Sequence, residues 1–106
     1  MRRVSIFGST GSIGQNTLDL VRKDPSSYHI VALTGGRNIK QLVKDAREFR
    51  PEIVVTAFSE FLPVLRAGVS DLGIEATAGE LAISDAADRP VDWVMSAIIG
   101  IAGLAP

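Results

Sequence analysis

The sequence predicts an α/β fold, a doubly wound, mostly parallel, Rossmann-like sheet with helices on both faces. Short apolar runs rich in β-branched residues alternate along the chain with amphipathic segments of helical period. Apolar strands without a polar face are typical of parallel sheets that are covered on both sides. Right-handed crossovers between such strands give the doubly wound arrangement.

The first half of the chain supplies two strand–helix units. A strand is expected over residues 2–7, and a helix over residues 13–24 follows a glycine-rich turn. The inner face of this helix is expected to carry Ile13, Thr17, Leu20 and Val21. A second strand over residues 28–34 leads to a second helix over residues 39–49, with Asn38 as its N-cap.

The second half of the chain continues the alternation. Pro51 ends the second helix. The further elements expected are a strand over residues 52–58, a helix over 60–67, a strand over 74–77, a helical turn or two over 80–86 and a last strand over 91–99. Because the chain stops just after this apolar strand, we expect it to be part of a longer protein.

The composition excludes several classes of function. The 106 residues suit one domain, and a hydrophobic fraction of 46% supplies a core. Eleven basic and twelve acidic residues give a net charge of −1, so no broad attraction to nucleic acid or membranes is expected. The absence of cysteine excludes disulfides and a cysteine nucleophile within these residues. No apolar stretch is long enough to span a membrane, so we expect a soluble chain.

The glycine-rich turn GSTGSIG, residues 8–14, lies between the first strand and the first helix, where nucleotide phosphates bind in such folds. We expect Gly8 to allow the tight turn, Gly11 to let a pyrophosphate approach the backbone, and Gly14 to let the helix pack closely. Three hydroxyls are expected to assist, those of Ser9, Thr10 and Ser12. Gln15 stands where an ATP-binding P-loop has lysine, and a turn without a ligand remains an alternative.

The end of the second strand indicates which dinucleotide binds. NAD-binding domains carry an acidic residue there, which holds the ribose 2′-hydroxyl. This strand ends in Thr34-Gly35-Gly36-Arg37-Asn38, without an acid. A carboxylate would repel a 2′-phosphate, whereas the Arg37 guanidinium matches its charge and geometry. The sequence therefore favours NADPH over NADH.

Three segments resemble a known family: GSTGSIGQNTLDLV at 8–21, VALTGGRN at 31–38 and SAIIGIAGLAP at 96–106. They are similar to the N-terminal NADPH-binding domain of the 1-deoxy-D-xylulose 5-phosphate reductoisomerases, and the resemblance covers residues 1–106. The cofactor contacts that it implies are Thr10, Gly11, Ser12, Ile13, Gly36, Arg37 and Asn38. Ala97 and Ile98 would lie toward the nicotinamide.

The resemblance implies an enzyme of non-mevalonate isoprenoid biosynthesis. The family isomerises the phosphosugar 1-deoxy-D-xylulose 5-phosphate and reduces it with NADPH to 2-C-methyl-D-erythritol 4-phosphate. It uses a divalent cation (Mg²⁺, Mn²⁺ or Co²⁺), is inhibited by fosmidomycin, and is expected to be a cytoplasmic homodimer.

The family's metal and catalytic residues lie beyond Pro106. We therefore expect no catalytic or metal-ligating residue in this chain, and no activity from it alone. Neither His29 nor the acidic group Asp85, Asp88 and Asp92 is expected to serve as one. Two alternatives stay open, another NADP-dependent reductase such as a semialdehyde dehydrogenase and a non-catalytic dinucleotide-binding module.

Overall fold

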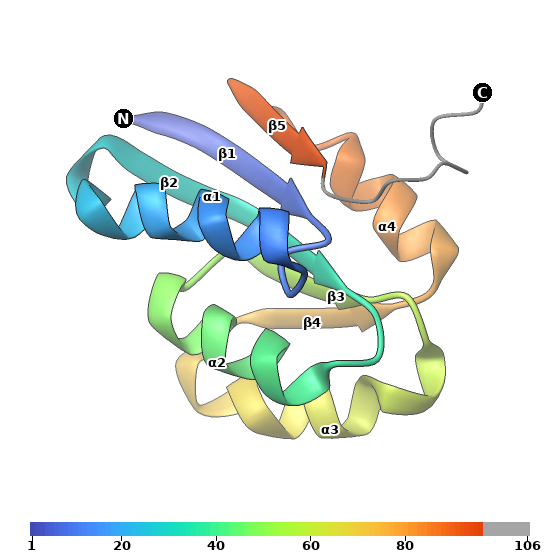
Figure 1. Cartoon of the computed structure of the whole chain (residues 1–106). Coiled ribbons are helices and arrows are strands. Elements are labelled where there is room, and N and C mark those ends of the chain that lie inside the picture. The colour runs from blue at the N-terminus through green and yellow to red at the C-terminus, as the bar shows by residue number, and fades with distance from the viewer. Residues whose placement is uncertain (97–106) are drawn as a thin grey trace.

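The computed structural model describes residues 1–96, and their strands form a parallel sheet in the order β4-β3-β2-β1-β5 (Figure 1). The strands are β1 (Arg2–Phe7), β2 (Tyr28–Gly35), β3 (Ile53–Thr56), β4 (Glu75–Ala78) and β5 (Trp93–Ser96). The α-helices are α1 (Ser12–Lys23), α2 (Ile39–Phe49), α3 (Leu62–Val69) and α4 (Glu80–Ala87). Short 3₁₀ turns are η1 (Pro25–Ser27), η2 (Ser59–Phe61) and η3 (Ser70–Leu72).

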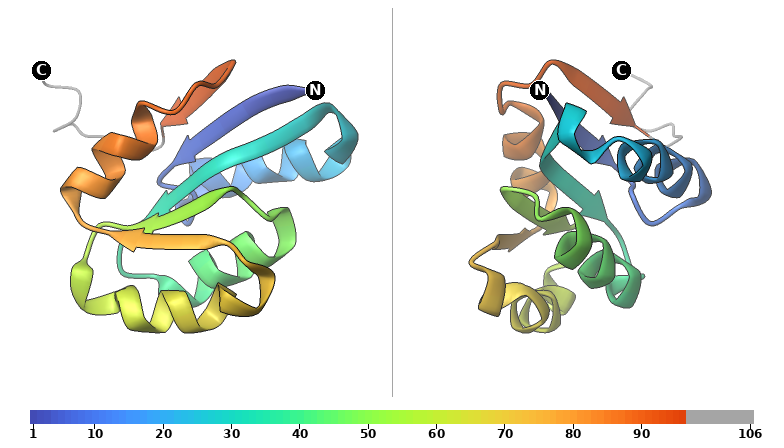
Figure 2. Two further views of the ribbon diagram at one scale, coloured as in Figure 1. Left: turned by 180° about the vertical axis from the view of Figure 1, so that it is seen from behind. Right: turned by 90° about the vertical axis from the view of Figure 1, so that its left-hand side faces the viewer.

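The order of the strands explains which helices cover which face. The chain steps outward from β1 to β4, so right-handed crossovers place α1, α2 and α3 on one face. It then returns across the sheet to pair β5 with the free side of β1, which places α4 on the opposite face (Figure 2). The predicted parallel sheet with helices on both faces is confirmed.

Alternate residues of β1, β2 and β3 contribute to two apolar clusters, one on each face of the sheet. On the larger face, Val4 and Ile6 of β1 pack with buried leucines of three helices, namely Leu18, Leu42 and Leu65. On the face of α4, Phe7, Ala32 and Val55 pack against Ala86 and Ile83. Both faces of these three strands are therefore largely apolar, which is why their sequences lack a polar alternation.

The predicted inner face of α1 is partly wrong. Thr17 and Val21 are buried as expected, but Ile13 and Leu20 are 50% and 58% exposed. The buried stripe is Gly14, Thr17, Leu18 and Val21. This stripe has the same helical spacing but begins one residue later, because the helix approaches the glycine turn most closely at Gly14.

Other predicted elements agree with the structure to within a few residues at their ends. Asn38 caps α2, since its side-chain oxygen accepts a hydrogen bond from the Gln41 amide at 3.3 Å. β3 ends at Thr56 rather than at residue 58, since the chain bends at Ala57 and the Phe58 amide donates to the Thr56 hydroxyl at 3.3 Å. The rest of the last predicted strand, to residue 99, lies outside the described residues. None of the helices in residues 1–96 has the length and hydropathy needed to cross a membrane.

An ionic cluster holds the amino-terminal ends of the strands together. The Glu52 carboxylate lies 3.2 Å from Arg3, 2.8 Å from His29 and 3.5 Å from Arg89. The His29 hydrogen bond and the Arg3 charge lower the pKa of Glu52. His29 thus links β2 to Glu52, just before β3, at the amino-terminal ends of the strands, whereas the glycine turn lies at their carboxyl ends.

Candidate functional site

The glycine turn is held against the carboxyl end of β2. The amides of Gly8 and Ser9 donate to the Thr34 carbonyl at 3.0 and 2.9 Å. Gly8 has φ of 80°, a conformation that side chains disfavour. A Cβ on Gly14 would lie 2.4 Å from the Gly8 carbonyl oxygen, so only glycine allows α1 to start here. The expected roles of Gly8 and Gly14 in building the turn are confirmed.

Neither backbone conformation nor packing within the described residues requires glycine at position 11. Its φ of −79° suits any residue, and its backbone is exposed. A Cβ built on it would meet only the Gly8 carbonyl oxygen, at an ordinary 3.8 Å. The fold of residues 1–96 therefore accepts a larger residue at this position. The space that glycine leaves open faces outward, where a ligand can approach the backbone.

Three backbone donors of the turn lie next to Gly11 in the chain. The amides of Thr10, Ser12 and Ile13 donate to no acceptor within residues 1–96. Ser12 and Ile13 begin α1, where the first N–H groups have no partner in the helix and carry its partial positive charge. No acidic side chain stands in this first turn. The arrangement suits a phosphate group.

The prediction that the Ser9 hydroxyl assists in phosphate binding is wrong. Its side chain is fully buried, and its hydroxyl donates to the Thr34 carbonyl at 3.4 Å. It therefore stabilises the turn from inside and does not face a ligand. Thr10 is half-buried and Ser12 is exposed, so those two hydroxyls remain on the outer side.

The second glycine segment lies beside the first. A Cβ on Gly35 would lie 3.3 Å from the side chain of Leu42 and 3.4 Å from the Thr10 methyl group. A hollow of about 180 Å³ opens between the two segments, the end of β3 and α4. Its lining is Gly8, Thr34, Gly35, Gly36, Ala57 and Ile83. The tertiary structure thus brings the two glycine segments together at the carboxyl ends of the strands, and Gly36 is the one predicted contact among the residues that line this hollow.

Arg37 lies at the rim of this region. Its guanidinium carbon is 4.4 Å from the centroid of the Phe58 ring, a cation–π contact. No carboxylate within residues 1–96 pairs with it. Asn38 follows, with its side-chain oxygen used by the α2 cap. The positive charge is therefore available to an anion.

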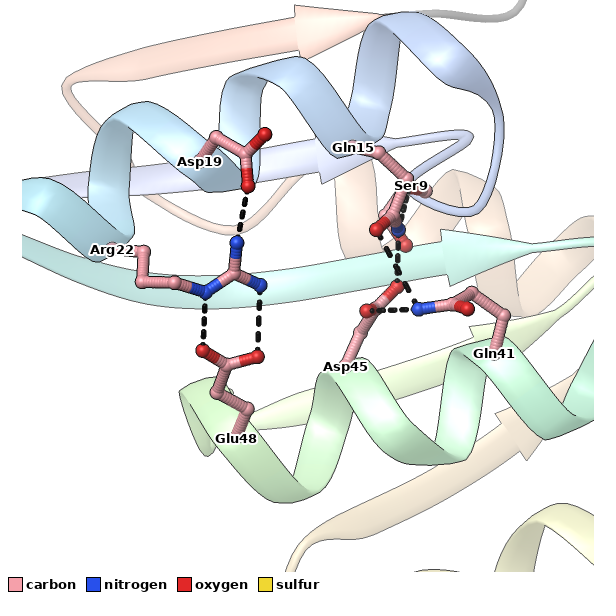
Figure 3. A network of polar contacts seen from close by, with 7 residues as sticks. All are labelled: Ser9, Gln15, Asp19, Arg22, Gln41, Asp45 and Glu48. Atoms are coloured by element: carbon pink, nitrogen blue, oxygen red, sulfur yellow. Dashed lines mark hydrogen bonds and ion pairs between the residues drawn. The ribbon is translucent and has the colours of Figure 1, made fainter.

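A partly buried polar network joins the glycine turn and the start of α1 to α2 (Figure 3). The Gln15 side-chain amide donates to the Ser9 carbonyl at 2.9 Å and to the Asp45 carboxylate at 2.8 Å. The Gln41 side-chain amide donates to the other Asp45 oxygen at 2.8 Å. Asp45 is 1% exposed, and burial raises its pKa although both amides oppose the shift. The network holds the start of α1 to α2.

Sequence reasoning missed this network and the Phe58 contact. The spacing of Gln41 and Asp45, four residues apart on α2, shows that the two can meet, but Gln15 comes from another helix. Farther along α1, Arg22 donates two hydrogen bonds to Glu48 and also contacts Asp19 (Figure 3). These bonds lower the pKa of Glu48.

The acidic residues near the end of the chain do not form a metal site. Within the described part of the chain, no three histidine, aspartate or glutamate side chains gather so that they could hold an ion. Asp92 instead accepts a hydrogen bond from the Arg3 amide at 2.8 Å. Ala97 and Ile98, expected near a nicotinamide, lie outside the described residues.

Comparisons with known sequences point to one family. The family model of 1-deoxy-D-xylulose 5-phosphate reductoisomerase matches residues 4–106. The reductoisomerase of that name from Jannaschia sp. is 63% identical to this chain, in an alignment that covers 99% of it. The one from Ruegeria pomeroyi is 59% identical, over 100% of the chain. The chain spans 27% of the length of each of these relatives.

Solved structures of reductoisomerases are similar to this chain in both fold and sequence. The reductoisomerase from Zymomonas mobilis in complex with NADPH is 40% identical, with a TM-score of 0.93 over 97% of this chain and 27% of that one. A second reductoisomerase, in complex with NADPH, fosmidomycin and magnesium, is 36% identical. It has a TM-score of 0.88 over 99% of this chain and 26% of that one.

Proposed function

The chain belongs to the 1-deoxy-D-xylulose 5-phosphate reductoisomerase family, and on that basis we propose that residues 1–106 form an NADPH-binding domain. The proposed contacts are Thr10, Gly11, Ser12, Ile13, Gly36, Arg37 and Asn38. Solved relatives of the same fold carry NADPH, which supports this assignment.

The observation that carries the proposal is the outward surface of the glycine turn. The described fold does not require glycine at position 11, so the space beside its backbone is open to a ligand. The amides of Thr10, Ser12 and Ile13 have no acceptor within residues 1–96. A pyrophosphate placed on this surface accepts hydrogen bonds from these amides and lies at the positive end of α1. The partly buried Gln15–Asp45–Gln41 network holds the turn through the bond from Gln15 to the Ser9 carbonyl, so the donors are held in place before the ligand binds.

The second glycine segment supports the choice of NADPH over NADH. Arg37 has no paired carboxylate within residues 1–96 and lies beside the backbone of Gly36. The guanidinium can donate two parallel hydrogen bonds to a 2′-phosphate, and the side-chain amide of Asn38 can add another. NADH offers only a 2′-hydroxyl, which cannot form this charged pair.

For the whole protein we propose the family's reaction, in which 1-deoxy-D-xylulose 5-phosphate is isomerised and reduced to 2-C-methyl-D-erythritol 4-phosphate. NADPH supplies the hydride when bound, and the residues of this chain bind and orient it. A divalent cation, a homodimeric state and a cytoplasmic location belong to the same proposal. The magnesium in a solved relative supports the cation. Family membership disfavours the alternative of a semialdehyde dehydrogenase.

The test is the affinity of Arg37→Ala for NADPH and NADH, measured by calorimetry on the whole protein. Loss of a charge-assisted hydrogen-bonding partner costs about 1.5–3 kcal/mol, so NADPH should bind about 10- to 150-fold more weakly. NADH affinity should change less than twofold, about the scatter of such measurements. Arg50→Ala, the same charge change at the other end of α2, is the matched control. Equal losses for both dinucleotides would contradict the assignment of Arg37.

A further inference from the structure

We propose that Phe58 is a positioning residue that sets the preference for NADPH by holding the guanidinium of Arg37. The inference rests on the proposed function and adds to it a residue outside both glycine segments. Phe58 follows β3, about twenty residues beyond Arg37 in the chain, and only the tertiary structure brings the two together.

The Phe58 ring is itself fixed in place. It packs edge to face against Phe61, with ring centroids 6.1 Å apart and planes at 83°. The Phe58 amide donates to the Thr56 hydroxyl at 3.3 Å, which anchors the residue to the end of β3. A ring held at both its backbone and its edge gives a cation a stationary surface.

The turn after β3 is also tied to the turn after β2. The Thr56 hydroxyl donates to the Gly36 carbonyl at 2.9 Å, and the Ala57 amide donates to the Gly35 carbonyl at 2.9 Å. A Cβ on Gly36 would lie 3.5 Å from the Phe58 ring, so the ring lies against the backbone just before Arg37. The position of the ring and the start of the Arg37 side chain are therefore set by the same hydrogen bonds.

The kind of contact matters for binding. A cation–π contact draws on the charge of the guanidinium, and no N–H group of the Arg37 side chain is hydrogen-bonded within residues 1–96. The Phe58 ring therefore orients Arg37 without using the donors that a phosphate needs. By contrast, Arg22 and Arg47 direct their N–H groups to carboxylates of this chain. Holding an exposed, flexible side chain in advance reduces the conformational entropy that is lost when the ligand binds.

The experiment compares 2′,5′-ADP with 5′-AMP, two nucleotides that differ by the 2′-phosphate and lack the nicotinamide. Their affinities are measured by calorimetry on the whole protein for wild type, Phe58→Leu, Phe58→Tyr and Arg37→Ala. Phe58→Leu should weaken 2′,5′-ADP about fivefold, which corresponds to about 1 kcal/mol, and leave 5′-AMP within about twofold. Phe58→Tyr keeps the aromatic face and should bind 2′,5′-ADP like wild type.

A double-mutant cycle tests whether Phe58 acts through Arg37. In the Arg37→Ala background, Phe58→Leu should cause no further loss of 2′,5′-ADP affinity. A fluorinated variant, trifluorophenylalanine at position 58, keeps the shape of the ring but weakens its negative face. It should reproduce the Phe58→Leu loss with the thermal stability unchanged, and it covers the case in which Phe58→Leu does not fold.

Several results would overturn the inference. They are equal weakening of the two nucleotides by Phe58→Leu, additive losses in the double mutant, or a fluorinated variant that binds like wild type. Failure of the proposed function has a different signature. In that case the wild type binds both nucleotides equally, or Arg37→Ala leaves their ratio unchanged. A protein in which Arg37→Ala changes the ratio and Phe58→Leu does not would refute the role of Phe58 alone.

Discussion

Substitution of Gly14 and of Gly11 by alanine should affect two different properties of this protein, its stability and its nucleotide binding. We expect Gly14→Ala to destabilise the fold and Gly11→Ala to impair nucleotide binding while the fold remains nearly as stable. The two glycines are three residues apart in one turn, so the same change of a single methyl group separates a requirement of the fold from a requirement of the ligand.

The structure gives the size of the first effect. A Cβ on Gly14 would lie 2.4 Å from the Gly8 carbonyl oxygen, 2.5 Å from the Ser9 Cα and 2.6 Å from the Ser9 carbonyl oxygen. All three are backbone atoms, so no side-chain rotation relieves the clash. Overpacking costs about 3 kcal/mol at the upper end of its usual range, and alanine regains about 1 kcal/mol as a better helix former. The expected net loss in the free energy of unfolding is about 2 kcal/mol.

The second effect follows from the open space at Gly11. A Cβ there would lie 3.8 Å from its nearest neighbour among the described residues, which is an ordinary contact. Gly11 is the N-cap of α1, where alanine is less favourable than glycine by about 0.5–1 kcal/mol. A methyl group would keep a pyrophosphate away from the amides, so NADPH affinity should fall at least tenfold, or by about 1.4 kcal/mol.

Urea unfolding measures the stabilities, and calorimetry measures NADPH binding. Trp93 is the single tryptophan of the chain and lies on β5, which pairs with β1, so its fluorescence follows the sheet next to the turn. A Gly14→Ala chain as stable as wild type would show that the turn yields easily and would refute the clash argument. A Gly11→Ala chain with unchanged NADPH affinity would show that no ligand requires the glycine.

Two further predictions concern the residues that support the site. Burial raises the pKa of Asp45 above that in the unfolded chain, so the folded state binds more protons between the two values, and the contribution of Asp45 to stability increases as pH falls toward 3.8. The free energy of unfolding of wild type relative to Asp45→Asn, measured in urea from pH 7 downward, should therefore rise; a difference independent of pH would contradict this. Asn38→Ala should lower the free energy of unfolding by about 1 kcal/mol through loss of the α2 cap, whereas the neighbouring exposed Lys40→Ala should change it by less than about 0.5 kcal/mol. Equal effects of these two variants would exclude a capping role.

Local patterns along the chain suffice to place the helices and strands in order and to identify the two segments that form the candidate site. Apolar β-branched runs and helical spacing act over a few residues, so β1, β2, α2 and the other elements could be placed from local patterns. The roles of Gly8 and Gly14 could likewise be predicted, because a tight turn between a strand and a helix leaves no room for a side chain at these positions.

How those elements face one another depends on contacts between residues that are far apart in the chain. Two helical stripes of α1 have the same spacing, and the close contact at Gly14 selects the one with Leu18 over the one with Ile13. Hydrogen bonding to β2 turns Ser9 inward. The contacts of Asp45 with Gln15 and of Phe58 with Arg37 join residues that are distant in the chain. Their formation depends on the packing of α1 on α2 and of β3 on β2, which no local pattern encodes.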